Sequence, residues 1–255
     1  RQALIIQAEG TARNIISAAL EKKHNPPPDE KITAITAQIF HGFYHQDPAQ
    51  IPLLRLRPYL TNKRIPAFIR LPDGLIETLI NKGFCDNAAR MLSFVLAQEG
   101  FSSVQWNMVS PSAAHAALLI AMPDGRKVFA DPFYGYVTID ENGHLVSPFE
   151  AQNLLISGNQ FSSVFLALGE NSEPDFYRSF KNVAMGAAGD PLILDTDLPL
   201  LHGEPLVLGK IDGDDRDVKS DGIRHALTPF WHYVGHKYNR EWVRTSKAAE
   251  PVRRV

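Results

Sequence analysis

The single cysteine of this 255-residue chain, Cys85, is followed by a histidine and an aspartate that could serve it in catalysis. A lone thiol cannot form an internal disulfide, so Cys85 is either a small buried apolar side chain or a nucleophile. Acyl transfer by a thiol needs a base that titrates near neutral pH and a third group that orients the base. His115 and Asp131 are the candidates, which gives a predicted Cys-His-Asp triad for acyl transfer or amide hydrolysis.

The segment that begins at Cys85 has the apolar spacing of an amphipathic helix. Ala88, Leu92 and Leu96 recur every four residues, and Gly100 is a plausible helix end. The thiol is therefore predicted at a helix N-terminus, where the positive end of the helix dipole and unpaired backbone N–H groups favour a thiolate.

A predicted β-hairpin would bring the base and its orienting group together. Residues 115–122 and 127–135 have the composition of strands, and Asp124-Gly125 between them is a turn sequence. Antiparallel pairing about this turn sets position 115 opposite position 132 or 133. His115 and Asp131 are therefore expected at the same end of the hairpin.

The remaining elements are predicted from periodicity and turn residues. Further helices are expected over 2–22, 31–46, 73–81 and 150–158, and strands over 104–110, 136–140, 144–148, 161–170, 205–213 and 228–244. Residues 52–74 contain four prolines and are expected to form a loop with short extended pieces. The expected division is a catalytic domain over 1–190 and a β-rich extension over 191–255, with 171–200 rich in loops.

Composition and charge exclude some classes of function. With 26 basic and 28 acidic residues and a net charge of −2, the chain has no electrostatic footprint for nucleic acid. The apolar run at 116–122 is far shorter than the roughly 20 residues that span a bilayer, so no membrane span is expected. The sequence begins at Arg1, which leaves both a cytoplasmic chain and a periplasmic or membrane-anchored chain with a trimmed leader open. The oligomeric state is not indicated.

Three separated blocks of sequence resemble the transglutaminase-like superfamily. The blocks are the upstream helix DEKITAITAQIFHGFYHQ, the string KGFCDNAARMLSFVLAQEGF, and HAALLIAMPDGRKVFADPFYG, which together cover roughly residues 30–140. The residues that match the family pattern are Gly83, Cys85, His115, Asp131, Pro132 and Gly135. Arylamine N-acetyltransferases carry Arg-Gly-Gly-x-Cys, from which residues 81–84 depart, and eukaryotic transglutaminases have further domains. The resemblance is to a compact bacterial-type member.

The resemblance implies an α+β, papain-like fold with the cysteine-bearing helix packed on an antiparallel sheet. It also implies a thioester mechanism without a cofactor, in which Cys85 attacks a carboxamide or peptide carbonyl, His115 moves the proton and Asp131 holds the imidazole. Water or an amine acceptor would then release the acyl group. The alternative is a catalytically idle domain that serves binding or assembly, for example in a cell-envelope or polysaccharide system.

Residues that would bind the substrate are less well defined by the sequence. One oxyanion donor would be the backbone N–H of Cys85, and His41, Tyr44 and His45 at the end of the upstream helix are candidates for the second. Trp106 either lines the acyl site or belongs to the core.

Metal binding is not favoured by the histidine spacings. His41 and His45 are four residues apart, which on a helix would put two imidazoles on one face for a metal. His232 and His236 fall in a strand-like segment, where the same spacing separates the two side chains by about 13 Å. No metal site is predicted.

Overall fold

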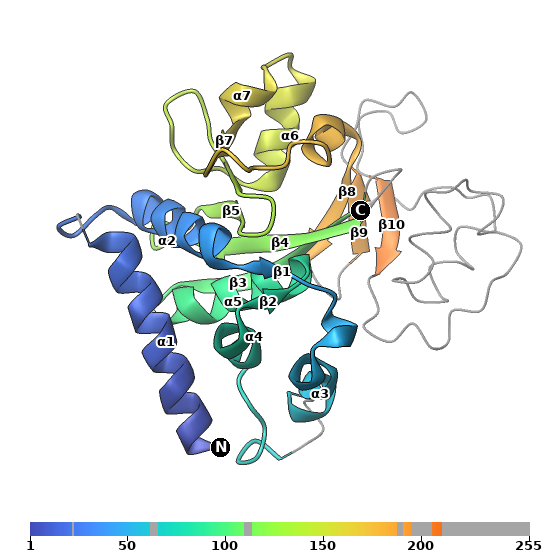
Figure 1. Ribbon diagram of the computed structural model, residues 1–255. Helices are drawn as coiled ribbons and strands as arrows, with labels where there is room; N and C mark the ends of the chain where they lie inside the picture. The colour runs from blue at the N-terminus through green and yellow to red at the C-terminus, as the bar shows by residue number, and fades with distance from the viewer. Residues whose placement is uncertain (22, 62–65, 110–113, 188–190, 195–205, 211–255) are drawn as a thin grey trace, which may run out of the picture. The chain divides into compact units, whose positions relative to one another are not determined.

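The computed structural model describes residues 1–21, 23–61, 66–109, 114–187, 191–194 and 206–210 (Figure 1). The chain forms two compact units. Unit 1 comprises Arg1–Gln105, Ala117–Ser147 and Phe165–Glu173, and unit 2 comprises Trp106–Ala116, Pro148–Val164 and Pro174–Val255. Strands β3 (Ser102–Val109) and β4 (Ala114–Ala121) each contribute residues to both units.

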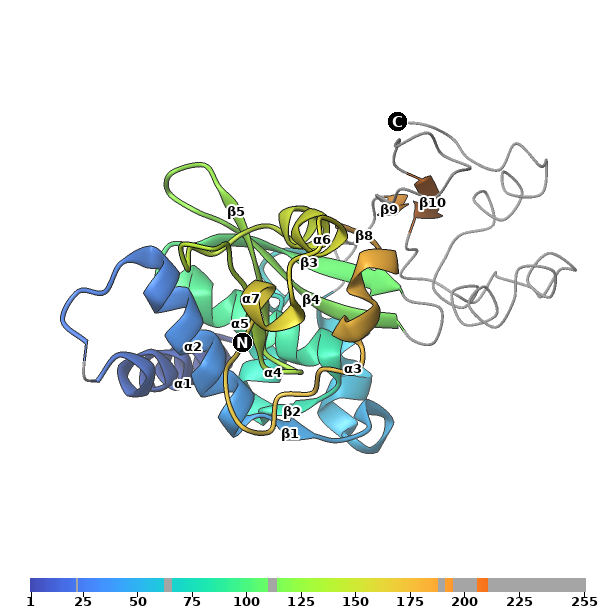
Figure 2. The ribbon, with the colours of Figure 1, turned by 90° about the horizontal axis from the view of Figure 1, so that it is seen from above.

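Unit 1 begins with two long helices that were predicted from their apolar periodicity. The helices of this unit are α1 (Gln2–Leu20), α2 (Pro28–Gly42), α3 (Pro52–Leu60), α4 (Leu75–Ile80) and α5 (Cys85–Gln98), with a short 3₁₀ turn at Pro48–Gln50. Ala8, Ala12 and Ile16 lie at four-residue steps along the buried face of α1. Both ribbon views show α1 and α2 side by side (Figures 1 and 2). None of the helices in the described parts of the chain has the length and apolar content to traverse a bilayer.

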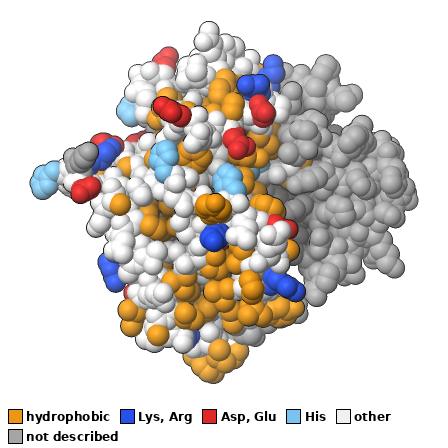
Figure 3. All heavy atoms as spheres, viewed as in Figure 1, with side chains coloured by type: hydrophobic (Ala, Val, Ile, Leu, Met, Phe, Trp, Pro, Cys, Tyr) orange, Lys and Arg blue, Asp and Glu red, His pale blue; other side chains and the backbone are white. Residues whose placement is uncertain are grey.

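Helix α3 was not predicted, because its prolines were interpreted as loop residues. Pro52 occupies the first turn of the helix, where a missing N–H group costs nothing. Leu54 faces inward and is 5% exposed, whereas Leu56 and Tyr59 are exposed. Figure 3 shows apolar side chains gathered on the surface over this part of the molecule.

The sheet strands of unit 1 confirm the predicted hairpin. Strand β4 pairs antiparallel with β5 (Lys127–Asp131), which pairs with β6 (Tyr136–Thr138), which in turn pairs with β7 (Phe165–Ala167). The hairpin turn closes through a hydrogen bond from Gly125 N to Met122 O, and Gly125 has the positive φ that such turns require. The predicted strand over 144–148 is wrong, since only Leu145 forms an isolated bridge, to Ile139.

The core of unit 1 lies between these helices and the sheet. Leu92, Val95 and Leu96 of α5 belong to one buried cluster with apolar residues of α1, α2, β4 and β5. Each fully buried side chain of this size stabilises the fold by about 2 kcal/mol. The helix that carries Cys85 and the strands β4 and β5 therefore contribute side chains to the same buried cluster.

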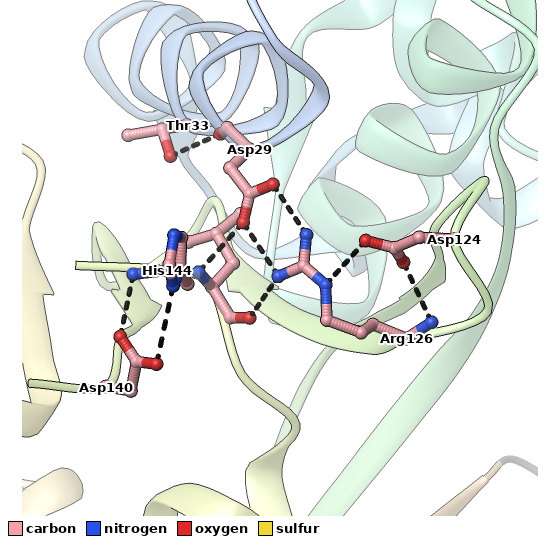
Figure 4. A network of polar contacts seen from close by, with 7 residues as sticks. Asp29, Thr33, Asp124, Arg126, Asp140 and His144 are labelled. Atoms are coloured by element: carbon pink, nitrogen blue, oxygen red, sulfur yellow. Dashed lines mark hydrogen bonds and ion pairs between the residues drawn. The ribbon is translucent and has the colours of Figure 1, made fainter. Parts of the chain in front are cut away.

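Arg126, in the hairpin turn, links the start of α2 to the sheet through hydrogen bonds to Asp29 (Figure 4). Arg126 donates to both carboxylate oxygens of Asp29 at 3.0 and 2.9 Å, and to Asp124 at 2.7 Å. Leu145 N donates to Asp29 at 2.9 Å. Burial raises the pKa of Asp29, but the hydrogen bonds from Arg126 and Leu145 outweigh it, and the net pKa is lowered.

Unit 2 contains strands that sequence patterns did not reveal. Its elements are the Trp106–Val109 part of β3, the start of β4, α6 (Pro148–Ile156), α7 (Phe161–Val164), a 3₁₀ helix (Tyr177–Asn182), β8 (Ala184–Ala187), β9 (Pro191–Leu194) and β10 (Leu206–Lys210). Strand β8 pairs antiparallel with β3, with Met185 opposite Met108. Ala184–Ala187 contains no β-branched residue, so the sequence predicted a loop here. Hydrogen bonding to β3 makes this segment a strand.

Three further predictions can be compared with the structure. Residues 161–164, expected in a strand, form helix α7, and the strand begins only at Phe165. Strand β10 confirms the expected strand over 205–213, and β9 precedes it, whereas residues 228–244 lie outside the described residues. The division near residue 190 stays a prediction. The combination of helices and antiparallel sheet confirms the α+β class.

Candidate active site

Cys85 is the first residue of α5 and is half-buried. This confirms the predicted position of the thiol at a helix N-terminus. The N–H groups in the first turn of a helix have no acceptor within the helix and can stabilise negative charge that is placed beside them.

The start of α5 is fixed by a cap that depends on glycine. Asn87 Oδ1 accepts a hydrogen bond from Phe84 N at 3.0 Å, which satisfies a backbone donor next to the cysteine. Gly83 has φ +144°, and a Cβ atom at this position would lie 2.4 Å from the same Asn87 oxygen. Only glycine leaves room for this cap.

A buried carboxylate and an arginine connect α3, α4 and the first turn of α5. Arg57 Nε lies 3.3 Å from Oε1 of Glu77, whose side chain is fully buried, and Arg57 Nη2 lies 3.9 Å from Asp86 Oδ2. Burial raises the pKa of Glu77, and the charge of Arg57 opposes that rise. Because Asp86 follows Cys85 directly, the pair helps to hold the segment that carries the thiol.

Asp131 is the last residue of β5 and is completely buried. Its Oδ1 accepts hydrogen bonds from Phe133 N at 2.8 Å and Tyr134 N at 3.2 Å. These backbone donors fix the orientation of the carboxylate. Asp131 therefore has the rigidity that a group orienting an imidazole requires.

An aromatic stack joins the Asp131 loop to the segment before Cys85. The imidazole of His45 stacks on Phe133, with ring centroids 4.1 Å apart and planes 16° apart. His45 belongs to β1 (Tyr44–His45), which pairs in parallel with β2 (Lys82–Gly83), so His45 lies opposite Gly83. Cys85 and Asp131 thus belong to one unit whose connecting segments are in contact through His45.

Tyr44 and His45 were expected at the end of the upstream helix, but that helix ends at Gly42. Tyr44 is 68% exposed, with Lys82 Nζ 5.6 Å from the centre of its ring. The Tyr44 side chain in β1 therefore lies at the surface. Its partner in β2 is Lys82, three residues before Cys85.

His115 and Trp106 belong to unit 2. His115 is 4% exposed on β4, and its ring packs against Phe176 at 5.2 Å and Tyr177 at 6.1 Å. Trp106 is buried on β3 and meets Phe149 edge-on at 5.5 Å. Its burial agrees with the expectation that it is a core residue.

Within the described residues, no group of three or more His, Cys, Asp or Glu side chains is arranged to hold a metal ion. His45 lies in β1 rather than on the helix that carries His41, so the two imidazoles do not share a helical face. His232 and His236 lie outside the described residues.

Comparisons with known proteins give distant structural neighbours. No protein-family model matches the chain, and no curated protein matches it significantly in sequence. A solved structure described as a transglutaminase (TGase) is 12% identical over 51% of this chain, with a TM-score of 0.36, and the match spans about a third (32%) of that protein. Calcium-bound LapG from Legionella pneumophila is 13% identical, with a TM-score of 0.19, over 48% of this chain and 72% of that one.

Proposed function

We propose that this chain is a thiol-dependent enzyme that cleaves or transfers an amide or peptide bond through a Cys85 thioester. The observation that carries the proposal is the position of Cys85, half-buried at the first residue of α5. A thiol in this position has the electrostatic environment of a nucleophile. The buried, doubly hydrogen-bonded Asp131 in the same unit supports an orienting role for its carboxylate.

His115 is proposed as the base. Strand β4 carries His115 and, three residues further along, Leu118, whose partner in β5 is Ala130, the residue before Asp131. The same antiparallel register, continued by one residue, sets Ala117 opposite Asp131, and His115 lies two positions before Ala117 along β4. The burial of His115 supports a fixed imidazole.

The chemistry proceeds in two balanced steps. In the first, the sulfur of Cys85 attacks the carbonyl carbon, His115 takes the thiol proton and gives it to the leaving amine, and the C–N bond breaks. In the second, water or an amine acceptor attacks the thioester, and His115 moves its proton to the departing sulfur. The N–H of Cys85 would stabilise the oxyanion, with Tyr44 and His45 as candidates to contact the substrate.

The reactivity of the thiol tests the proposal directly. The alkylation rate of folded protein by iodoacetamide at about pH 6 is compared with that of the same chain in urea, where its single cysteine is an ordinary thiol. We expect the folded chain to react at least about tenfold faster. Equal rates would show that the thiol is not activated and would favour a binding domain.

Substitutions then separate the roles of the three residues. Cys85→Ser should abolish release of amine from peptide and carboxamide substrates, and His115→Asn and Asp131→Asn should lower its rate by factors of about a hundred or more. His144→Asn is the matched control, because the side chain of His144 is 66% exposed and its partner is Asp140, a residue outside the proposed triad. Adding a primary amine distinguishes transfer from hydrolysis by the product formed.

A further inference from the structure

The outward face of α3 is apolar although the opposite face is already packed. Leu53, Leu56 and Tyr59 follow one another at three-residue steps and are 39%, 52% and 73% exposed, while Leu54 is buried beneath them. A surface helix normally presents polar residues outward. Helix α3 therefore has exposed apolar side chains on its outer face in addition to the apolar side chain that it buries in the core.

The loop after α3 extends this stripe. Phe68 and Ile69 are 76% and 54% exposed. The loop is tied to the end of α3 by a hydrogen bond from Leu71 N to Leu60 O at 2.9 Å. We call Leu53, Leu56, Tyr59, Phe68 and Ile69 the α3 surface, which is visible as a gathering of apolar side chains in Figure 3.

Both charged residues of α3 are arginines, and the acidic side chains Asp73 and Asp86 near the helix are ion-paired with one of them, Arg57. Arg55 is exposed on α3 between Leu53 and Leu56, and Arg1 Nε donates to the backbone oxygen of Arg70 at 3.0 Å, which brings two more arginines beside the loop. No acidic residue occurs between positions 51 and 72. The next one, Asp73, is paired with Arg90 at 2.6 Å.

We propose that the α3 surface binds the surface of an anionic lipid bilayer. Exposed leucine and aromatic side chains interspersed with arginines are the composition of segments that lie in the membrane interface. Each arginine near an anionic lipid surface adds to the electrostatic attraction. A second copy on the same surface is disfavoured, because two-fold pairing would set these arginines against their own copies.

Vesicle binding of the full chain tests this inference independently of the proposed enzymatic activity. Co-sedimentation is measured with vesicles of phosphatidylcholine alone and with vesicles that also contain phosphatidylglycerol. We expect binding to the second kind only, weakened by added salt. The double substitution Leu56→Ser with Phe68→Ser should weaken it about tenfold or more, and Arg55→Gln should weaken it severalfold.

Leu166→Ser is the matched control, because Leu166 is also an exposed leucine (42%) but lies on β7, away from α3 in Figure 1. Circular dichroism confirms that each variant is folded. The proposal is overturned if wild type does not bind the anionic vesicles, or if the double variant binds them as well as Leu166→Ser does. Concentration-dependent dimers that disappear in the double variant would also overturn it, in favour of self-association.

Discussion

The imidazole of His45 and the ring of Phe133 lie in a parallel stack 4.1 Å apart, which joins the strand beside Gly83 to the loop that follows Asp131. The Phe133 amide in turn donates to Asp131. The stack therefore couples the position of the carboxylate to the segment that enters α5. Neither residue would need to touch a substrate for this coupling to matter.

Replacing His45 by alanine should loosen this connection. We expect His45→Ala to lower the free energy of unfolding by about 1 kcal/mol, the typical contribution of an aromatic pair beyond its buried area. His45→Phe keeps the stack and should retain wild-type stability in urea titration. Under the proposed function, the kcat of His45→Ala falls while that of His45→Phe stays near wild type. Loss of kcat in both variants would instead assign the imidazole a direct contact with substrate.

Gly83→Ala should damage the start of α5. The added Cβ would overlap Asn87 Oδ1, and we expect a loss of about 3 kcal/mol of unfolding free energy together with slower alkylation of Cys85. The matched control is Gly100→Ala just past the other end of the helix, where φ is also positive (+82°) but nothing lies within 4 Å. That variant should lose about 1 kcal/mol and keep the alkylation rate. Equal losses would contradict a steric role for Asn87.

Arg57→Met should leave Glu77 buried without its partner and destabilise the fold by about 3–5 kcal/mol at neutral pH. Because the folded-state pKa of Glu77 is raised, the carboxyl favours folding below its unfolded pKa, and this contribution is lost as the pH rises through the folded value. Without Arg57 the pKa rises further, so the variant should be least stable at high pH.

The double substitution of Arg57 and Glu77 by methionine is the control for that prediction. It removes both charges from the same place, and it should recover most of the stability and lose the added pH dependence. Urea unfolding of the four proteins between about pH 5 and pH 8 measures the coupling. Additive losses would show that the two side chains act independently.

Acid should weaken the connection between α2 and the hairpin. The pKa of Asp29 is lowered in the folded chain, so its contribution to stability is present above the unfolded pKa and is lost as the pH falls through the folded value. Asp29→Asn should therefore differ most from wild type near neutral pH and least near about pH 3. Thermal unfolding across this range checks the convergence. A difference that grows toward acid would contradict the assigned role.

Local patterns predicted the elements that carry the proposed nucleophile and carboxylate. The four-residue spacing after Cys85 and the Asp124-Gly125 turn each depend on neighbours in sequence, and α5 and the β4–β5 hairpin formed where expected. The end of α2 was placed too late because Phe43 continues the three- and four-residue apolar spacing of Ile35 and Ile39. Tyr44 and His45 instead form strand β1 by pairing with β2, whose residues are distant in sequence.

The contacts that hold the candidate site in place could not be predicted from the sequence, because they too join residues that are distant in sequence. Arg57 meets Glu77 and His45 meets Phe133 across long sequence separations, and no spacing rule links either pair. Strand β8 shows the same limit, since residues with weak strand preference became a strand by pairing with β3. One sequence signal for the Arg57 region was available, namely proline at the first position of a helix.

Because the sequence contains a single cysteine, oxidation of Cys85 has no resolving partner within this chain. A sulfenic acid formed there could not condense to an internal disulfide, and its recovery would depend on a thiol from another molecule. Half-burial at the helix start limits how large that molecule can be. Cys85 is therefore the one thiol of this sequence that an oxidant can convert to a sulfenic acid, and small thiols are the reagents suited to restore it.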